Sequence, residues 1–222
     1  MAYDLEEQEQ IATFKAFWST YGNLITWVLI VALAGYAGYN FWNSHKRGQS
    51  AEASGLYNQL LESLQANDNA KVQRIAGDIE SKFGGTLYAS MAALGAAKGA
   101  FDANDLKTAK AQLQWAADHG EDEYKSLAKL RLAGVLLDEK AYDQALAQLN
   151  GDFLPQFKAD VADRKGDILV AQNKLADARS AYQAALAAMD QKNPGRPLVQ
   201  LKLDSLGGSQ PAGADAKAAP AA

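Results

Sequence analysis

One long stretch of this sequence carries no charged side chain. No Asp, Glu, Lys, Arg or His lies between Lys15 and His45, and the apolar centre of the stretch is residues 24–42. A helix of that length reaches roughly 28 Å, close to the ~30 Å hydrocarbon core of a bilayer. Aromatic residues gather near both ends of the uncharged stretch, as membrane interfaces favour: Trp18, Tyr21, Tyr39, Phe41 and Trp42. The stretch predicts one transmembrane helix over residues 24–42, preceded by an acidic N-terminal tail, residues 1–23.

A buried core helix and a cleaved signal peptide fit the apolar stretch less well. A core helix rarely runs this long without a charge. A signal peptide is suggested by the small residues in AEA, positions 51–53, but such a peptide begins with positive charge. This chain begins instead with four acidic residues: Asp4, Glu6, Glu7 and Glu9. We therefore expect an uncleaved single-pass anchor in contact with membrane lipid.

The flanks and the interior of the span carry two further signals. Lys15 stands on the amino side, against Lys46 and Arg47 on the carboxyl side. Counting positive charges thus places the following domain in the cytoplasm, by a margin of one side chain. Ala34 and Gly38, four residues apart, are the candidate packing residues for another membrane helix, although glycine is also simply common in such helices.

The rest of the chain has helical periodicity. From about residue 49 it becomes rich in alanine, and no stretch alternates apolar and polar residues long enough to predict a sheet. Residues 43–206 therefore predict an all-α domain, which the helices before Gly84 and a last helix over 197–206 close at its two ends. Residues 207–222 have almost no apolar bulk and predict a disordered Gly/Ala/Pro tail.

Three segments of this domain repeat one pattern. They align on three alanines, Ala109, Ala145 and Ala178, separated by 36 and 33 residues. A large residue stands three before each alanine and another four after, and a small residue lies twelve before: Ala97, Ala133 and Gly166. The second copy departs at seven after, where Asp152 replaces a small residue. This is the pattern of tetratricopeptide repeats, in which paired antiparallel helices stack into a shared core.

The composition excludes several kinds of chemistry. The chain has no cysteine and two histidines, His45 and His119, so thiolate catalysis and zinc or iron–sulfur clusters are excluded. Its net charge of −4 argues against nucleic-acid binding. His119 and its acidic neighbours are better explained by Gly120 ending one helix before the amino end of the next. We expect no cofactor, no metal and no enzymatic activity; a hydrolase that uses Asp160–Asp167 is the weakest alternative.

Stacked helical hairpins present an extended concave surface, which suits a peptide or a partner helix. In the repeat register, the inner helices turn apolar and charged residues toward it: Leu94, Lys98, Phe101, Asp102, Leu127, Leu130, Leu137, Asp160, Asp163 and Asp167. The leucines are equally compatible with a core. The three aspartates also fit a solvated face on which Arg164 pairs with Asp160.

Several segments are specific in combination. They are the acidic leader EEQEQ, FKAFWSTYG (14–22), FWNSH (41–45), SGLYNQLL (54–61), LAKLRLAG (127–134), ADARSAY (176–182) and LVQLKLDSL (198–206). Together they resemble a bacterial inner-membrane family, the YfgM-type ancillary subunits of the SecYEG translocon. FWNSH and the closing KLDSL are the most telling, and the resemblance covers about residues 5–206.

The resemblance implies a cytoplasmic amino terminus and a periplasmic repeat domain, against the one-residue charge bias. It implies association with SecYEG and with the membrane-anchored PpiD-type chaperone, and passage of emerging, unfolded secreted proteins to periplasmic chaperones. It also implies a link to restraining the Rcs response regulator. The acidic tail could bind such a regulator, and a cytoplasm-facing scaffold for a signalling protein stays open as the alternative.

Overall fold

The structure, a computed structural model, describes residues 2–207, and the part described is helical throughout apart from turns and short connections. It divides into two compact units, Met1–Ala51 and Glu52–Ala222. The expected tail over 207–222 lies outside the described residues except for Gly207. Helix α1, Ala2–Gln65, runs without a break through both expected boundaries of the membrane segment.

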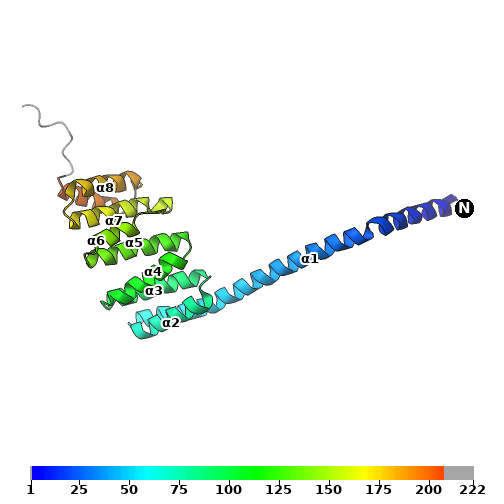
Figure 1. Ribbon diagram of the computed structural model, residues 1–222, viewed down its shortest axis with the longest axis horizontal. Helices are drawn as coiled ribbons and strands as arrows, with labels where there is room; N and C mark the ends of the chain where they lie inside the picture. The colour runs from blue at the N-terminus through cyan, green and yellow to red at the C-terminus, as the bar shows by residue number, and fades with distance from the viewer. Residues whose placement is uncertain (1, 208–222) are drawn as a thin grey trace, which may run out of the picture. The chain divides into compact units, whose positions relative to one another are not determined.

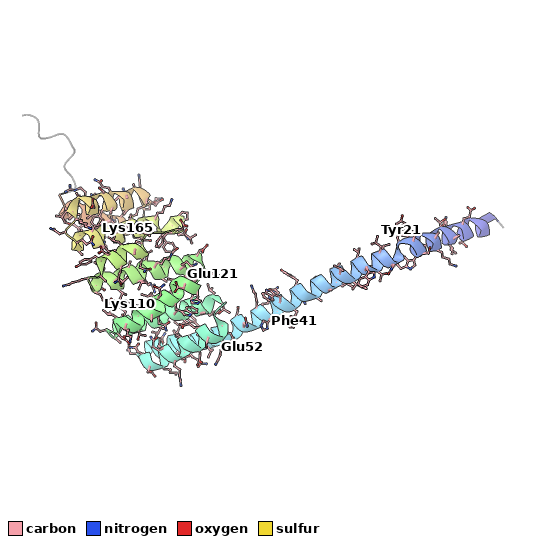
Figure 2. The ribbon with its side chains drawn as sticks, viewed as in Figure 1. Tyr21, Phe41, Glu52, Lys110, Glu121 and Lys165 are labelled. Atoms are coloured by element: carbon pink, nitrogen blue, oxygen red, sulfur yellow. The ribbon has the colours of Figure 1, made fainter. Side chains whose placement is uncertain are left out.

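The amino-terminal unit consists of the first part of α1. This helix is long and apolar enough to cross a membrane, and none of its most apolar stretch is buried within the protein. Figure 2 shows the side chains of Tyr21 and Phe41 projecting outward from the helix. Both rings are exposed, as are the tryptophans Trp18, Trp27 and Trp42. An apolar, uncovered helix surface of this kind is stable in lipid and unfavourable in water.

The second unit is a stack of helical hairpins followed by a closing helix, as Figure 1 shows from α2 to α8. The end of α1 pairs with α2, and α3 with α4, α5 with α6 and α7 with α8, before α9. Their bounds are α2 Asn69–Phe83, α3 Leu87–Asp102, α4 Leu106–His119, α5 Asp122–Asp138, α6 Tyr142–Gln148, α7 Lys158–Ala171, α8 Leu175–Ala188 and α9 Arg196–Ser205, with a 3₁₀ turn at Pro155–Phe157 before α7. The predicted all-α repeat fold is confirmed.

The turns of the four hairpins have the same geometry. Each turn contains a residue with left-handed backbone geometry, and three of the four are asparagine, the side chain that tolerates this geometry best after glycine: Asn67, Asn104, Lys140 and Asn173. In each turn the following N–H donates to the carbonyl five residues earlier, as Asp105 does to Ala100. Asp68 and Asp105 then cap the next helix, each accepting a hydrogen bond from the backbone N–H three residues on. The turn therefore fixes where the first helix of each hairpin ends and the second begins.

The first hairpin is a repeat that alanine alignment could not find. Its turn stands 37 residues before that of α3 and α4, so Leu60 and Val72 occupy the places of Ala97 and Ala109. Both large residues are fully buried. The space for Leu60 comes from α3, because a Cβ added at Gly95 would meet Leu60 at 3.2 Å. Large residues on one helix and glycine on its neighbour therefore replace the small pairs of the later copies.

Small residues stand where the helices of a hairpin touch. Ala109, Ala145 and Ala178, the three alignment positions, are all fully buried. The closest approach is at Gly166 of α7, where an added Cβ would lie 2.3 Å from Cε1 of Tyr182. The second copy departs at Asp152 because α6 ends at Gln148, and residue 152 lies in the connection that follows.

Candidate partner-binding groove

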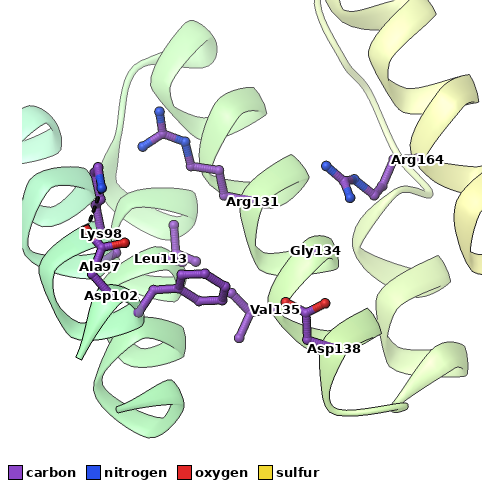
Figure 3. Close-up of a pocket in the computed structure, with 10 residues that line it drawn as sticks. Ala97, Lys98, Asp102, Leu113, Arg131, Gly134, Val135, Asp138 and Arg164 are labelled. Carbon is purple, nitrogen blue, oxygen red and sulfur yellow. Dashed lines mark hydrogen bonds and ion pairs between the residues drawn. The ribbon is translucent and has the colours of Figure 1, made fainter. Parts of the chain in front are cut away.

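A groove of about 440 Å³ lies along the first helices of three successive hairpins, α3, α5 and α7. It is drawn in Figure 3, where side chains from these helices surround an open space. The lining residues are Ala97, Lys98, Phe101 and Asp102 of α3, Leu113 of α4, Arg131, Gly134, Val135 and Asp138 of α5, and Arg164 of α7. Repeated helices at a constant offset thus produce one continuous surface.

The apolar part of the groove comes from Phe101, Leu113 and Val135. Leu113 and Val135 are almost fully buried in the core beneath, whereas Phe101 leaves 43% of its surface exposed. Gly134 keeps the wall of α5 low, so that the guanidinium of Arg164 lies over it: an added Cβ would be 3.7 Å from Cζ. An aromatic ring exposed beside a backbone surface is a suitable contact for an apolar side chain.

The charges of the groove are unevenly paired. Lys98 forms an ion pair with Asp102 one turn further along α3. Arg164 lies 3.8 Å from Asp167, a long contact, and within residues 2–207 no ion pair involves Arg131 or Asp138. Figure 3 shows Arg131 and Arg164 toward one end of the opening and Asp138 toward the other.

The predicted groove residues divide into two groups. Lys98, Phe101 and Asp102 line the groove, as expected from the repeat register. Leu94 and Leu130, with 6% and 8% of their surface exposed, belong to the core instead. Leu127 and Leu137 are also packed against that core. Of the two alternatives for these leucines, the structure thus supports the core, where they serve the packing between helices.

Sequence reasoning missed the α5 and α7 side of the groove. Arg131, Gly134 and Asp138 follow each other at intervals of three and four residues and so share one face of α5. This face lies one residue, or about 100°, beyond the leucine positions that the register selected. The sequence does contain this series, one residue on each turn of α5. It was passed over because the leucines on the neighbouring face gave the stronger helical periodicity.

Asp163 and Asp167 of α7 contact the closing helix, and none of the three predicted aspartates of α7 lines the groove. Lys202 Nζ of α9 lies 2.8 Å from Asp163 and 2.7 Å from Asp167. Asp167 also accepts a hydrogen bond from the hydroxyl of Tyr182 at 2.9 Å. Arg164 pairs with Asp167 and forms no ion pair with Asp160 within the described chain, so that predicted pair is corrected. These contacts attach α9 to the last hairpin.

The surroundings of this cluster shift three pKa values. Burial, the hydrogen bond to Asp167 and the nearby carboxylates all raise the pKa of the Tyr182 hydroxyl. Burial by itself lowers the pKa of Lys202, but its bonds to Asp163 and Asp167 outweigh burial and raise it. Burial and the charge of Asp163 raise the pKa of Asp160, although Arg164 opposes them. At neutral pH Lys202 is therefore protonated, and the Tyr182 hydroxyl keeps its proton.

The remaining candidate sites give no reactive arrangement. The described residues contain no group of three or more His, Cys, Asp or Glu side chains placed to hold a metal. His119 ends α4 before Gly120 and stacks on Trp115 at 4.7 Å between ring centroids. In the membrane segment Ala34 and Gly38 are exposed, and a Cβ added at Gly38 would meet nothing within 4 Å. This surface is open to lipid or to another helix.

Comparison with known proteins covers almost the whole chain. Residues 15–208 match the family model described as a tetratricopeptide repeat-like domain. The chain is 35% identical over 208 residues to the ancillary SecYEG translocon subunit of Neisseria gonorrhoeae, an overlap of 93% of this chain and 100% of the relative. Identity to the subunit of the same name is 31% in Haemophilus influenzae, over 93% of this chain and 100% of the relative. In Escherichia coli it is 27%, over 90% and 96%. No solved structure matches the chain significantly.

Proposed function

Since this chain belongs to the family of ancillary SecYEG translocon subunits with a tetratricopeptide repeat-like domain, we propose that it receives emerging secreted proteins in its groove and passes them to periplasmic chaperones. Association with the translocon and one apolar helix near the amino end fit a single-pass inner-membrane protein. The anchor would keep the repeat domain close to the translocon, where the concentration of unfolded chains is high.

The observation that carries this proposal is the open groove on a domain that is tethered to a membrane by its own chain. The groove offers an exposed aromatic ring, Phe101, beside charged side chains of both signs. Such a surface can bind extended chains of varied sequence weakly. Weak binding suits a protein that must release its clients to a PpiD-type chaperone. The homologues are named as translocon subunits, a non-enzymatic kind of protein.

The proposal requires the repeat domain to lie in the periplasm and the amino terminus in the cytoplasm. The family supports this orientation, and the excess of Lys46 and Arg47 over Lys15 opposes it by one charge. Two reporter fusions after Leu206 test it, one active only in the periplasm and one fluorescent only in the cytoplasm. A carboxyl end in the cytoplasm would contradict the hand-off function.

Cross-linking in intact cells tests the function itself. A photoreactive amino acid at Phe101 samples the groove, and the same substitution at Gln144, an exposed residue of α6 outside the groove, is the control. We expect the Phe101 position to capture newly secreted chains and, in addition, the PpiD-type chaperone or SecY. If both positions capture the same proteins equally, or neither captures any, the groove does not serve secretion.

A second function, restraint of a response regulator such as that of the Rcs system, is favoured by the acidic residues at the start of α1. Glu7 and Glu9 are exposed on this helix, and acidic side chains can pair with a basic protein surface. Replacing the four acids between residues 4 and 9 by their amides should then change signalling and leave export unchanged. Unchanged signalling would eliminate this alternative.

A further inference from the structure

We propose that the groove selects client segments in which a carboxylate precedes or follows a large apolar side chain, with a basic residue about three positions from the carboxylate. This inference rests on the proposed function, because it names the kind of secreted chain that the same groove would take. The occupant is an extended segment of an unfolded client, recognised by two guanidinium groups, one aromatic ring and one carboxylate of the groove.

Among the residues that the structure describes, the end of the groove that carries Arg131 and Arg164 has N–H donors without hydrogen-bond partners. The Lys98 ammonium is already paired with Asp102. The ion-pair partner of Arg164 is Asp167, whose Oδ2 lies 3.8 Å from it, while Oδ1 of Asp167 binds Lys202 at 2.7 Å and accepts from the Tyr182 hydroxyl at 2.9 Å. The Arg164–Asp167 contact at 3.8 Å is too long for a hydrogen bond, so the Arg164 guanidinium keeps unused N–H groups, which favour a carboxylate.

Arg131 strengthens the same preference. It is exposed at the groove, and the ion pairs of the described chain do not include it. Arg131 and Arg164 come from neighbouring helices, α5 and α7, and line one opening. Both guanidinium groups add positive charge to the same opening, and that charge attracts an incoming carboxylate.

Asp138 gives the groove a direction. It stands seven residues after Arg131 on one face of α5, so the two lie about 10 Å apart along the helix axis. An extended peptide covers that length in about three residues. When a carboxylate of the client binds Arg131, the client residue three positions along therefore lies at Asp138. A lysine or arginine is favoured at that client position.

The apolar part of the segment would lie between these charged ends. Phe101 is exposed in this groove, and Gly134 adds no side chain to it, so that the Arg164 guanidinium lies over the backbone of α5. Contact with Phe101 removes apolar surface from water on both partners, which supplies attraction that the exposed charges cannot. The charges then decide which apolar segments bind and in which direction.

Fluorescence anisotropy with short labelled peptides tests this selection on the full chain in detergent micelles. The probe is a capped peptide, Ser-Gly-Glu-Leu-Phe-Lys-Gly-Ser, without terminal charges. Two peptides serve as comparisons: one with Gln in place of Glu, and one with poly-Gly-Ser in place of the four central residues. We expect the Gln peptide to bind about fivefold more weakly and the Gly-Ser peptide to show no binding. Equal binding of the Glu and Gln peptides would overturn the proposal.

Groove variants identify the residues responsible. Arg131→Gln and Arg164→Gln should each weaken the Glu peptide about fivefold and leave the Gln peptide unchanged. Arg74→Gln, at an arginine of α2 outside the groove, is the matched control. Gly134→Leu should weaken both peptides, because its side chain enters the space that Arg164 now covers at 3.7 Å. An Arg74→Gln effect as large as that of the groove arginines would refute the assignment.

The cellular cross-links separate this inference from the function on which it rests. If Phe101 captures secreted chains but the Glu and Gln peptides bind alike, the function stands and the selectivity is wrong. If the peptides are discriminated but no secreted chain is captured, the chemistry stands and the function is wrong. Capture of only the PpiD-type chaperone from Phe101 would overturn the client as occupant of the groove.

Discussion

Replacing Gly166 by alanine should strongly destabilise the repeat domain, although alanine is a much better helix former than glycine. The new Cβ would lie 2.3 Å from Cε1, 2.5 Å from Cδ1 and 2.9 Å from Cζ of Tyr182. Non-bonded carbon atoms normally stay about 3.5 Å apart. The ring must therefore move by about 1 Å, or α7 and α8 must separate.

Both movements lower the stability of the domain. Tyr182 is buried, with 3% of its surface exposed, and its hydroxyl donates a hydrogen bond to Asp167. Overpacking of this kind costs about 1–3 kcal/mol, and loss of a hydrogen bond to a carboxylate costs about 1.5–3 kcal/mol. The higher helix propensity of alanine offsets about 1 kcal/mol of this loss. The net loss in the free energy of unfolding is therefore about 3 kcal/mol.

Urea unfolding of the full chain in detergent, followed by circular dichroism at about 222 nm, measures this loss. With a urea dependence of about 2 kcal/mol per molar, the midpoint should fall by about 1.5 M. Gly134→Ala is the matched control, because a Cβ there meets Arg164 at an ordinary 3.7 Å. It should raise stability by about 0.5–1 kcal/mol. Two equal midpoints would refute the reasoning, and a Tyr182→Leu change added to Gly166→Ala should restore part of the loss.

Three further predictions concern charge and the membrane segment. Lys202→Met should lower the free energy of unfolding by about 2 kcal/mol, because it leaves Asp163 and Asp167 side by side without their shared cation. A triple variant that also replaces both aspartates by asparagine should recover most of this lost stability in the same urea assay. Burial raises the pKa of Glu80. The stability that protonated Glu80 contributes is fully present below its unfolded pKa of about 4.3 and is lost as the pH rises through the higher folded pKa. Glu80→Gln should therefore stabilise the domain at about pH 7 by at most about 1 kcal/mol, and parallel melts should show this difference disappear below about pH 4. Gly38→Leu should leave the unfolding midpoint unchanged, because nothing lies within 4 Å of its Cβ position, and should reduce co-purification of SecYEG if this surface contacts a partner helix.

The fold could be predicted because its signals are local and repeated. The alignment on Ala109, Ala145 and Ala178 located the second helix of three hairpins, and each alanine is fully buried. The family resemblance is also confirmed. The first hairpin escaped because Leu60 and Val72 take the places of small residues, and the compensating glycines lie on a different helix. Compensation across helices has no spacing rule within one segment, so only the turn residues carried the signal.

The groove was harder to predict than the fold because it depends on rotation about each helix axis. An error of one residue turns a side chain by about 100°, which is enough to exchange core and surface. On α3 the register placed Lys98 and Phe101 correctly in the groove, but Leu94 of the same helix lies in the core. On α5 it selected Leu130 in place of Arg131. The aspartates of α7 were misplaced for another reason: their partner, Lys202, lies far away in sequence.

The ion pairs around Lys202 connect the stability of the last hairpin with the chemistry of the groove. Lys202 and Tyr182 both engage Oδ1 of Asp167, and they hold the carboxylate so that its Oδ2 lies 3.8 Å from Arg164, beyond hydrogen-bond distance. The closing helix α9 therefore does more than cover the end of the stack: it keeps a cation of the groove available. A variant that detaches α9 would return Asp167 to Arg164 and reduce the preference for acidic clients while the apolar contacts at Phe101 remain. Measuring both peptides on Lys202→Met thus tests whether the closing helix and the groove act together.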